Sequence, residues 1–190
     1  NGLRAKGTRI ISEIEFAAQS TSATLIGITG TNGKTTTTMM TYEILKNAGL
    51  NVGLAGNIGS SFAKQVAEED YEFYVLEISS FQLDDIDQFA PHIALITNIT
   101  PDHLDRYDYS FEAYIQAKLK ITKNQSSKNF FLFNADDEIL VSALKDHKTN
   151  AQTVSFGSNP TETTGSYLKD NQLILKNQKK TTMIQSVEFP

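Results

Sequence analysis

Short apolar runs alternate with amphipathic stretches along most of the chain. The runs at 23–28, 73–78 and 93–98 are almost continuously apolar, and segments with helical spacing of apolar residues lie between and after them. Strands that are apolar on both faces are typical of a parallel sheet covered by helices on each side. The pattern therefore predicts a three-layer α/β/α domain with a mostly parallel sheet, whose core spans residues 23–152.

The segment after the first apolar run has the pattern of a helix that packs on a sheet. Met40, Ile44 and Ala48 recur every four residues, and we expect this stripe to face the sheet. Gly49 is placed to end the helix, because glycine readily adopts the left-handed conformation after a last turn. The other predicted elements are helices at about 12–19, 61–68, 110–123 and 137–145, and strands at 51–54 and 130–133.

The pattern changes after about residue 153. Short apolar or β-branched runs are separated by turn residues, which is typical of antiparallel pairing. We expect a small antiparallel extension over residues 153–190, and we interpret residues 1–22 as a lead-in from a preceding domain. The runs are at 153–156, 166–168, 173–175 and 181–187, and the turn residues are at 169–172 and 177–180.

Composition narrows the functional classes. Of 190 residues, 39% are hydrophobic and 21% are charged, which is ordinary for a globular protein. The net charge of −5 argues against a nucleic-acid surface, which normally carries a basic excess. The absence of cysteine excludes a disulfide, a thiolate zinc site and a cysteine nucleophile. No apolar run is long enough to cross a bilayer. From the charge we therefore expect no nucleic-acid partner, and from the short apolar runs we expect no membrane.

A glycine-rich stretch, GITGTNGKTT, joins the first apolar run to the helix that follows. Glycines let the backbone approach a phosphate closely, and the N-terminus of a helix offers unpaired N–H groups to an anion. In such a loop Lys34 would reach the outer phosphates and the Thr35 hydroxyl would bind Mg²⁺. The residues expected to hold the phosphates are Gly30, Thr31, Asn32, Gly33, Lys34, Thr35 and Thr36.

The match to the usual phosphate loop is imperfect. The common pattern has a glycine five residues before its Gly-Lys pair, and that position is Ile28 here. A strand–turn–helix connection with a surface lysine is the alternative. The position of the stretch between a strand and a helix favours the phosphate loop.

Two further residues at predicted strand ends could take part in chemistry, and one of them could bind a metal. Glu77 closes an otherwise apolar strand, and burying an unpaired carboxylate is costly unless it has a partner such as Mg²⁺. The alternative is that Glu77 simply emerges into solvent. His103 lies between Asp102 and Asp105 just past another strand, and both a functional and a structural role are open.

Lys118 and Asn57 are ambiguous from the residues alone. Lys118 follows Phe111 by seven residues and Tyr114 by four, so it shares the apolar face of its helix. An inward lysine is expensive unless it is paired, modified or neutral, and a side chain that reaches water is the alternative these residues favour. Asn57 could contact a ligand or serve a turn. For Asp136 or Asp137, a helix N-cap is the preferred interpretation.

Taken together, these stretches resemble the central ATP-binding domain of the Mur ligases, cytoplasmic bacterial enzymes that add amino acids to the UDP-linked peptidoglycan precursor. The family's own loop has the shorter Gly-x-x-Gly-Lys form, which accounts for Ile28. The resemblance covers roughly residues 5–190, and LEISSFQLD with GNIG is most similar to the D-glutamate-adding members. The motifs that carry it are GITGTNGKTT, GNIG, LEISSFQLD, TPDHLDRY, AKLKI and FNADD, in family order.

The resemblance implies ATP and Mg²⁺ as cofactors. It implies that Thr35 and Glu77 bind one Mg²⁺ and that His103 contributes at a second. Lys118 matches the family's carbamylated lysine, which would carry a negative charge and serve the second metal. It also implies catalytic roles for Lys34, His103 and Lys118, and contacts to the precursor for Asn57, Ser79 and Gln82.

The implied reaction joins D-glutamate to UDP-N-acetylmuramoyl-L-alanine through an acyl phosphate, giving ADP and phosphate. The family's N-terminal UDP-binding and C-terminal amino-acid-binding domains have no counterpart in this sequence, so we expect a piece that is inactive alone, a monomer, and cytoplasmic. A folylpolyglutamate synthetase-like ligase and a non-catalytic nucleotide-binding module are the alternatives. The first is disfavoured by LEISSFQLD and GNIG, and the second by the joint presence of Glu77, His103 and Lys118.

Overall fold

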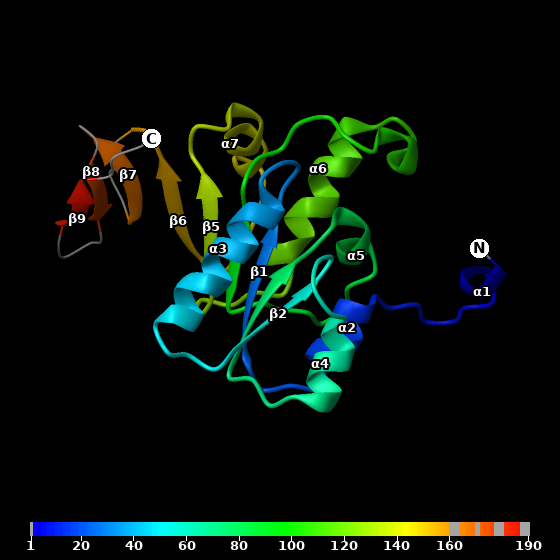
Figure 1. The fold of residues 1–190 in the computed structure, drawn as a ribbon. Helices are drawn as coiled ribbons and strands as arrows, with labels where there is room; N and C mark the ends of the chain where they lie inside the picture. Colours follow the sequence, from blue (N-terminus) through cyan, green and yellow to red (C-terminus); the bar gives the residue numbers. More distant parts are fainter. Residues whose placement is uncertain (1, 160–163, 170–171, 177–180, 187–190) are drawn as a thin grey trace.

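A mixed β-sheet forms the frame of the protein in a computed structural model that describes residues 2–159, 164–169, 172–176 and 181–186 (Figure 1). Within these residues the sheet has nine strands in the order β2-β3-β1-β4-β5-β6-β7-β8-β9. The strands are β1 (Thr24–Thr29), β2 (Val52–Gly56), β3 (Phe73–Glu77), β4 (Ile93–Ile96), β5 (Phe130–Asn134), β6 (Gln152–Gly157), β7 (Gly165–Lys169), β8 (Gln172–Lys176) and β9 (Thr181–Ser186).

Strand pairing confirms the predicted mostly parallel sheet and moves one boundary. All neighbours from β2 to β7 pair in parallel, and only β7–β8 and β8–β9 are antiparallel. The run at 153–156, which we assigned to the antiparallel extension, is part of the parallel strand β6. The helix that precedes it carries the chain back across the sheet, and such a crossover produces parallel pairing. Predicted turn residues 170–171 and 177–180, and residues 187–190, lie outside the described part.

Most helices begin at a side chain that caps them. The capping residues are Ser12, Ser61, Ser79, Ser110 and Asp137, and each accepts a hydrogen bond from a backbone N–H in the first turn. The predicted helix over 110–123 is divided into an α-helix and a 3₁₀ turn. The helices are α1 (Gly2–Ala5), α2 (Glu13–Ala18), α3 (Lys34–Asn47), α4 (Phe62–Glu68), α5 (Ser80–Asp84), α6 (Phe111–Leu119) and α7 (Glu138–Leu144), with 3₁₀ turns η1 (Leu104–Tyr107) and η2 (Lys120–Thr122).

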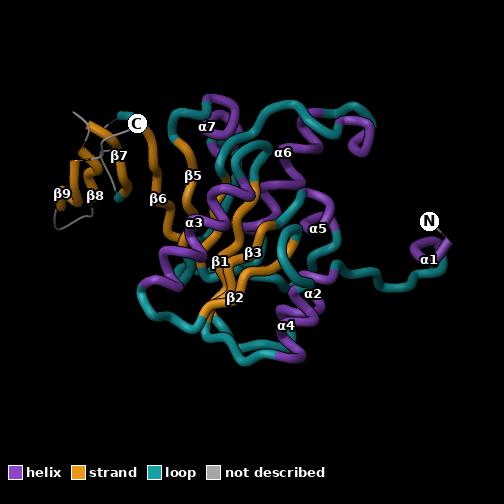
Figure 2. The backbone as a smooth tube through the Cα atoms, viewed as in Figure 1, coloured by secondary structure: helices purple, strands orange, loops and turns teal. Residues whose placement is uncertain are grey.

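Helices cover both faces of the first part of the sheet, as Figure 2 shows. On one face a large apolar cluster joins the strands to residues of α2, α4, α5, α6 and α7. On the other face α3 packs over β1, β2 and β3. The described helices include none that is long and apolar enough to cross a membrane. The sheet thus has helices on each side around β1, and the carboxyl ends of its parallel strands meet along one edge.

Helix α3 turns a different face to the sheet than its spacing predicted. Met40 and Ile44 are 60% and 65% exposed, whereas Thr38 is buried and Tyr42 and Leu45 pack against the smaller apolar cluster. Thr38 and Met40 are two residues apart, which is about 200° around a helix. Both stripes have helical spacing, so periodicity alone could not choose between them, and the expected packing of Met40 and Ile44 was wrong. Gly49 does end the helix, with a φ of 83°.

A buried carboxylate ties α2 to the segment before β4. Glu15 has no exposed surface and accepts hydrogen bonds from the backbone N–H groups of Asp87 at 3.0 Å, Gln88 at 3.0 Å and Phe89 at 2.7 Å. Desolvation by burial raises its pKa, but the hydrogen bonds together outweigh that effect, so its pKa lies below the ordinary value. The ionised form is therefore the one that the fold stabilises.

We expect Glu15→Gln to lower the free energy of unfolding by about 1–3 kcal/mol at pH 7, because one amide oxygen cannot replace two carboxylate oxygens facing three N–H groups. A group with a depressed folded pKa contributes stability above its unfolded pKa and loses it as pH falls through its folded pKa. The difference between variant and wild type in urea unfolding should therefore shrink below about pH 4. Gln19→Ala, which removes only a side-chain donor to Glu15, is the matched control. An equal difference at pH 7 and at low pH would contradict this assignment.

Candidate nucleotide and metal site

The glycine loop connects the end of β1 to the start of α3 at the carboxyl edge of the sheet. Gly30 and Gly33 have φ values of 143° and 79°, which side chains rarely adopt. A Cβ on Gly30 would collide with the Thr97 hydroxyl. The first N–H groups of α3, from Lys34 on, have no acceptor one turn earlier in the helix, so they face the loop as anion-binding donors. The backbone geometry thus fits a phosphate loop.

The Lys34 side chain folds back over this loop. Its Nζ donates a hydrogen bond of 2.8 Å to the carbonyl oxygen of Thr31. The ammonium is therefore already held above the N-terminus of α3, on the side where a bound anion would meet the helix dipole. Its contact with outer phosphates stays a prediction.

Glu77 lies beside the loop and is 1% exposed, so the alternative that it emerges into solvent is wrong. Its Oε2 accepts a hydrogen bond of 2.7 Å from the Thr35 hydroxyl, and its Oε1 accepts one of 2.8 Å from the Asn57 side chain. Gly56 has a φ of 101° and lets β2 approach the end of β3 closely, because a Cβ there would strike the Glu77 carbonyl. The structure brings together the two residues expected to share a Mg²⁺. A hydroxyl and a carboxylate are hard oxygen ligands of the kind that ion prefers.

His103 is exposed at the same edge but is not part of a preformed metal cluster. Its φ is 49°, and its Nε2 lies 3.6 Å from Asp102 Oδ2. The Phe81 ring contacts the imidazole edge to face, with 5.3 Å between ring centroids. Within the described residues, no three His, Asp or Glu side chains are grouped closely enough to hold a metal by themselves. A second metal near His103 therefore stays a prediction.

Lys118 is buried on the inner face of α6, as its spacing predicted. It is 2% exposed, so the alternative of an ammonium that reaches water is wrong. Its Nζ donates a hydrogen bond of 2.6 Å to the carbonyl of Gly30 and lies 4.6 Å from the centre of the Tyr114 ring. Desolvation by burial, and next the nearby charge of Lys34, lower the pKa of Lys118 to about 7. A large fraction of this amine is then neutral at physiological pH.

Ser79 and Gln82 form the cap at the start of α5. The Ser79 N–H donates to Gln82 Oε1 at 2.9 Å, and the Gln82 N–H donates to Ser79 Oγ at 3.3 Å. This reciprocal pair is a capping box. Both side chains have a local structural role, and their predicted contact with a precursor stays a prediction. Asp137 caps α7 as expected and also accepts a hydrogen bond from the Ile99 N–H at 2.7 Å.

Sequence reasoning missed the residues that support the loop from the segment directly after β4. The Asn98 side chain accepts a hydrogen bond from the Asn32 N–H and donates one to the Asn32 carbonyl, both of 2.9 Å. The Thr97 hydroxyl donates to the same carbonyl at 2.7 Å. The only sequence feature that could have indicated this role is that Thr97 and Asn98 form a polar pair directly after an apolar strand. It became meaningful only once β4 was known to lie next to β1.

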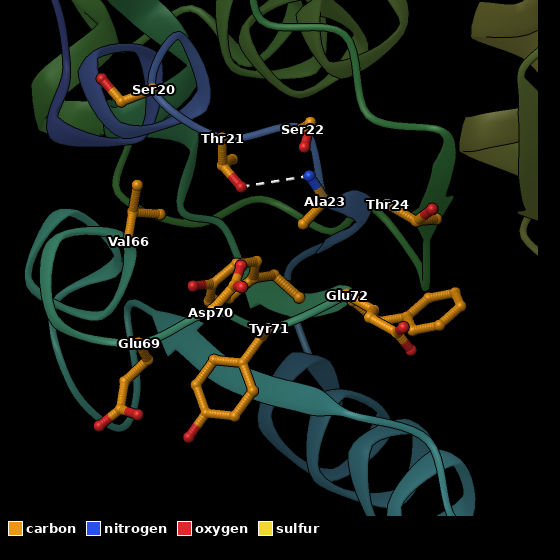
Figure 3. A pocket seen from close by; sticks show the side chains of 12 residues that line it. Ser20, Thr21, Ser22, Ala23, Thr24, Val66, Glu69, Asp70, Tyr71 and Glu72 are labelled. Atoms are coloured by element: carbon orange, nitrogen blue, oxygen red, sulfur yellow. Dashed lines mark hydrogen bonds between the residues drawn. The ribbon is translucent and has the colours of Figure 1, made fainter.

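A separate cavity of 560 Å³, shown in Figure 3, lies at the amino-terminal ends of β1 and β3. It is lined by the start of β1 and the start of β3, whereas the glycine loop follows the end of β1. Its rim carries exposed acidic side chains, and Thr21 accepts a hydrogen bond from the Ala23 N–H within it. The cavity is therefore distinct from the candidate site.

Comparison with known proteins places the chain in a family. Residues 28–189 match the profile of the family described as "Mur ligase middle domain". The chain is 53% identical over 173 residues to a UDP-N-acetylmuramoylalanine–D-glutamate ligase of Bacteroides fragilis, a match that covers 91% of this chain and 39% of that protein. It is 46% identical over 182 residues to the ligase of the same name from Christiangramia forsetii, covering 95% of this chain and 41% of the relative.

The fold agrees with that of a solved ligase structure. The ADP complex of the MurF ligase from Thermotoga maritima superposes with a TM-score of 0.63 at 24% identity, covering 90% of this chain and 43% of that one. The chain spans about two fifths of the length of the curated relatives it matches. From the family profile and the identity to these relatives, the chain belongs to the Mur ligase middle-domain family.

Proposed function

We propose that this chain is the ATP-binding core of a ligase that joins D-glutamate to UDP-N-acetylmuramoyl-L-alanine. The contact between the Thr35 hydroxyl and the buried Glu77 carboxylate, beside a glycine loop, carries the proposal. A buried acid that meets the first turn of a phosphate-loop helix is where Mg²⁺ binds with nucleotide phosphates. The substrates are proposed from the name of the ligases that are 46–53% identical to this chain.

In the proposed reaction, this chain mainly positions the reacting groups and neutralises the negative charge of the phosphates. The alanyl carboxylate takes the terminal phosphoryl group of ATP, and the D-glutamate amine then attacks the acyl phosphate. An amide bond forms, phosphate leaves, and the amine loses a proton. In this scheme the N–H groups at the start of α3 and the Lys34 ammonium bind the phosphates. Glu77 and Thr35 would hold a Mg²⁺ that neutralises their charge.

Lys118 is proposed to act as a carbamate. Its neutral amine would attack CO₂, forming an N–C bond and releasing a proton, and the product carries a negative charge. The burial of Lys118 and its pKa of about 7 support this step, because only the unprotonated amine is a nucleophile. The resulting anion, next to the glycine loop, would complement His103 as a group that serves a second metal.

The function is tested by the amino acid that drives ADP formation in the full-length protein. We expect D-glutamate together with UDP-N-acetylmuramoyl-L-alanine to raise the rate of ADP release by about 100-fold or more over either substrate alone. Measurement of ADP by a coupled assay, with L-glutamate and other D-amino acids as controls, distinguishes the candidates. Stimulation by a folate and L-glutamate would indicate the folylpolyglutamate alternative. A rate of ADP release that is the same with and without each amino acid would contradict the proposal.

A further inference from the structure

Thr31 belongs to the glycine loop, yet its hydrogen-bonding groups all face other protein atoms. Its N–H donates to the Asn98 carbonyl at 2.9 Å. Its hydroxyl donates to the carbonyl of Thr100 at 3.1 Å, accepts from the Thr100 N–H at 3.0 Å, and lies 3.1 Å from the Tyr114 hydroxyl. The residue is 8% exposed. Thr31 is thus a buried junction inside the loop.

The capacity of the Thr31 hydroxyl is fully used by these contacts. A hydroxyl has one proton and two acceptor lone pairs. A carbonyl can only accept, so the Thr31 proton points to Thr100, and Tyr114 must then be the donor in its contact with Thr31. Both lone pairs are occupied, one by Tyr114 and one by the Thr100 N–H. The hydroxyl has nothing left to offer a phosphate.

The three contacts join elements that carry the proposed chemistry. Tyr114 and Lys118 lie one turn apart on α6, and they touch consecutive loop residues, since Lys118 donates to the Gly30 carbonyl. The Tyr114 ring also lies against the Lys118 ammonium. On the other side, Thr100 is three residues before His103. Thr31 therefore sits where the loop, α6 and the segment toward His103 meet.

We propose that Thr31 is a positioning residue, whose hydroxyl holds the glycine loop in register with Lys118 and with the segment that leads to His103, and which gives no side-chain hydrogen bond to the nucleotide. This rests on the proposed function, because the register matters only if all three elements serve one reaction. The phosphates are then bound by the loop from Gly33 onward and by the first turn of α3.

The test compares Thr31→Val with Thr31→Ser in the full-length protein. Valine keeps the branched shape and removes the hydroxyl, and serine keeps the hydroxyl. We expect Thr31→Val to lower kcat for ADP formation by roughly tenfold or more, with KM for ATP and the affinity for ADP by calorimetry within about threefold of wild type. Thr31→Ser should recover most of the lost kcat. Thr41→Val is the matched control, because it makes the same change at a helix position whose hydroxyl donates to the Thr37 carbonyl within α3.

A double-mutant cycle with Tyr114→Phe tests the junction itself. Each single change removes the same hydrogen bond, so the combined loss in kcat should be smaller than the product of the two single losses. Tyr114→Phe also preserves the test if Thr31→Val fails to fold. Weakened ADP binding with unchanged kcat in Thr31→Val, equal impairment by serine and valine, or independent effects in the cycle would each overturn the inference. Wild-type protein that forms no ADP with both substrates would instead refute the proposed function.

Discussion

Replacement of Lys34 by alanine should abolish ATP-dependent turnover in the full-length protein, with ADP formation reduced by roughly 1,000-fold or more. The Lys34 ammonium already rests on the loop, 2.8 Å from the Thr31 carbonyl. It stands at the positive end of α3, where it would neutralise the negative charge on the phosphate oxygens in the transition state of phosphoryl transfer. Steady-state rates of ADP release with both substrates measure the effect.

Lys46→Ala is the matched control for this change. Lys46 lies on the last turn of the same helix and is exposed, with its ammonium 5.2 Å from the centre of the Tyr42 ring. It carries the same charge but is three turns from the loop. We expect its variant to retain wild-type turnover. A Lys34→Ala protein that is folded and turns over within about threefold of wild type would refute the assignment of the phosphate loop.

The second large effect is expected at Lys118. Lys118→Ala should lower turnover by about 100-fold or more, and added bicarbonate should not restore it, because the variant has no amine to carbamylate. Removal of a buried side chain also leaves a cavity, so Lys118→Met serves as a second variant that fills the space without the amine. Thermal unfolding of each variant separates lost activity from lost fold.

Direct detection distinguishes a carbamate from an unmodified lysine. Wild-type protein equilibrated with ¹³C-labelled CO₂ should show a carbamate carbon signal that is absent from Lys118→Met. Since the pKa of Lys118 is about 7, the neutral amine fraction falls as pH drops below 7, and the signal should weaken between pH 8 and pH 6. Lys120→Met is the control, because Lys120 forms an exposed ion pair of 2.7 Å with Asp84. Unchanged turnover in both Lys118 variants would refute the carbamate role.

Helical periodicity succeeded at Lys118 and failed at α3 for a physical reason. On α6, Tyr114, Lys118 and Leu119 are buried as the spacing indicated, and Ile115 and Ala117 are buried with them, so the inner face is broad and includes Lys118. On α3 the stripe of Met40 and Ile44 competes with that of Tyr42 and Leu45, and the local pattern is equally good for both. The connection from the glycine loop determines how the helix is rotated. That rotation is a property of the fold and not of the helix sequence.

Local chemistry alone predicted the parallel α/β core, the strand–loop–helix phosphate site and the inward lysine. These features depend on residues within about one turn or one strand of each other, where periodicity and capping rules operate. The register of the sheet decided what the site contains. Strand β1 lies between β3 and β4, with Ile28 paired to Glu77 and Thr29 to Ile96. That order places Glu77 and Asn98 on opposite sides of one loop.

The junction at Thr31 belongs wholly to the tertiary structure. Its partners Thr100 and Tyr114 are 69 and 83 residues away in the sequence. A threonine in a glycine loop looks like a phosphate ligand when only its neighbours are known. Whether its hydroxyl faces a ligand or the protein depends on which strand and helix pack behind the loop. The spacing of residues near Thr31 in the sequence cannot predict that packing. The sequence by itself therefore determined the strand–loop–helix connection, and only the fold decided which residues hold that loop in place.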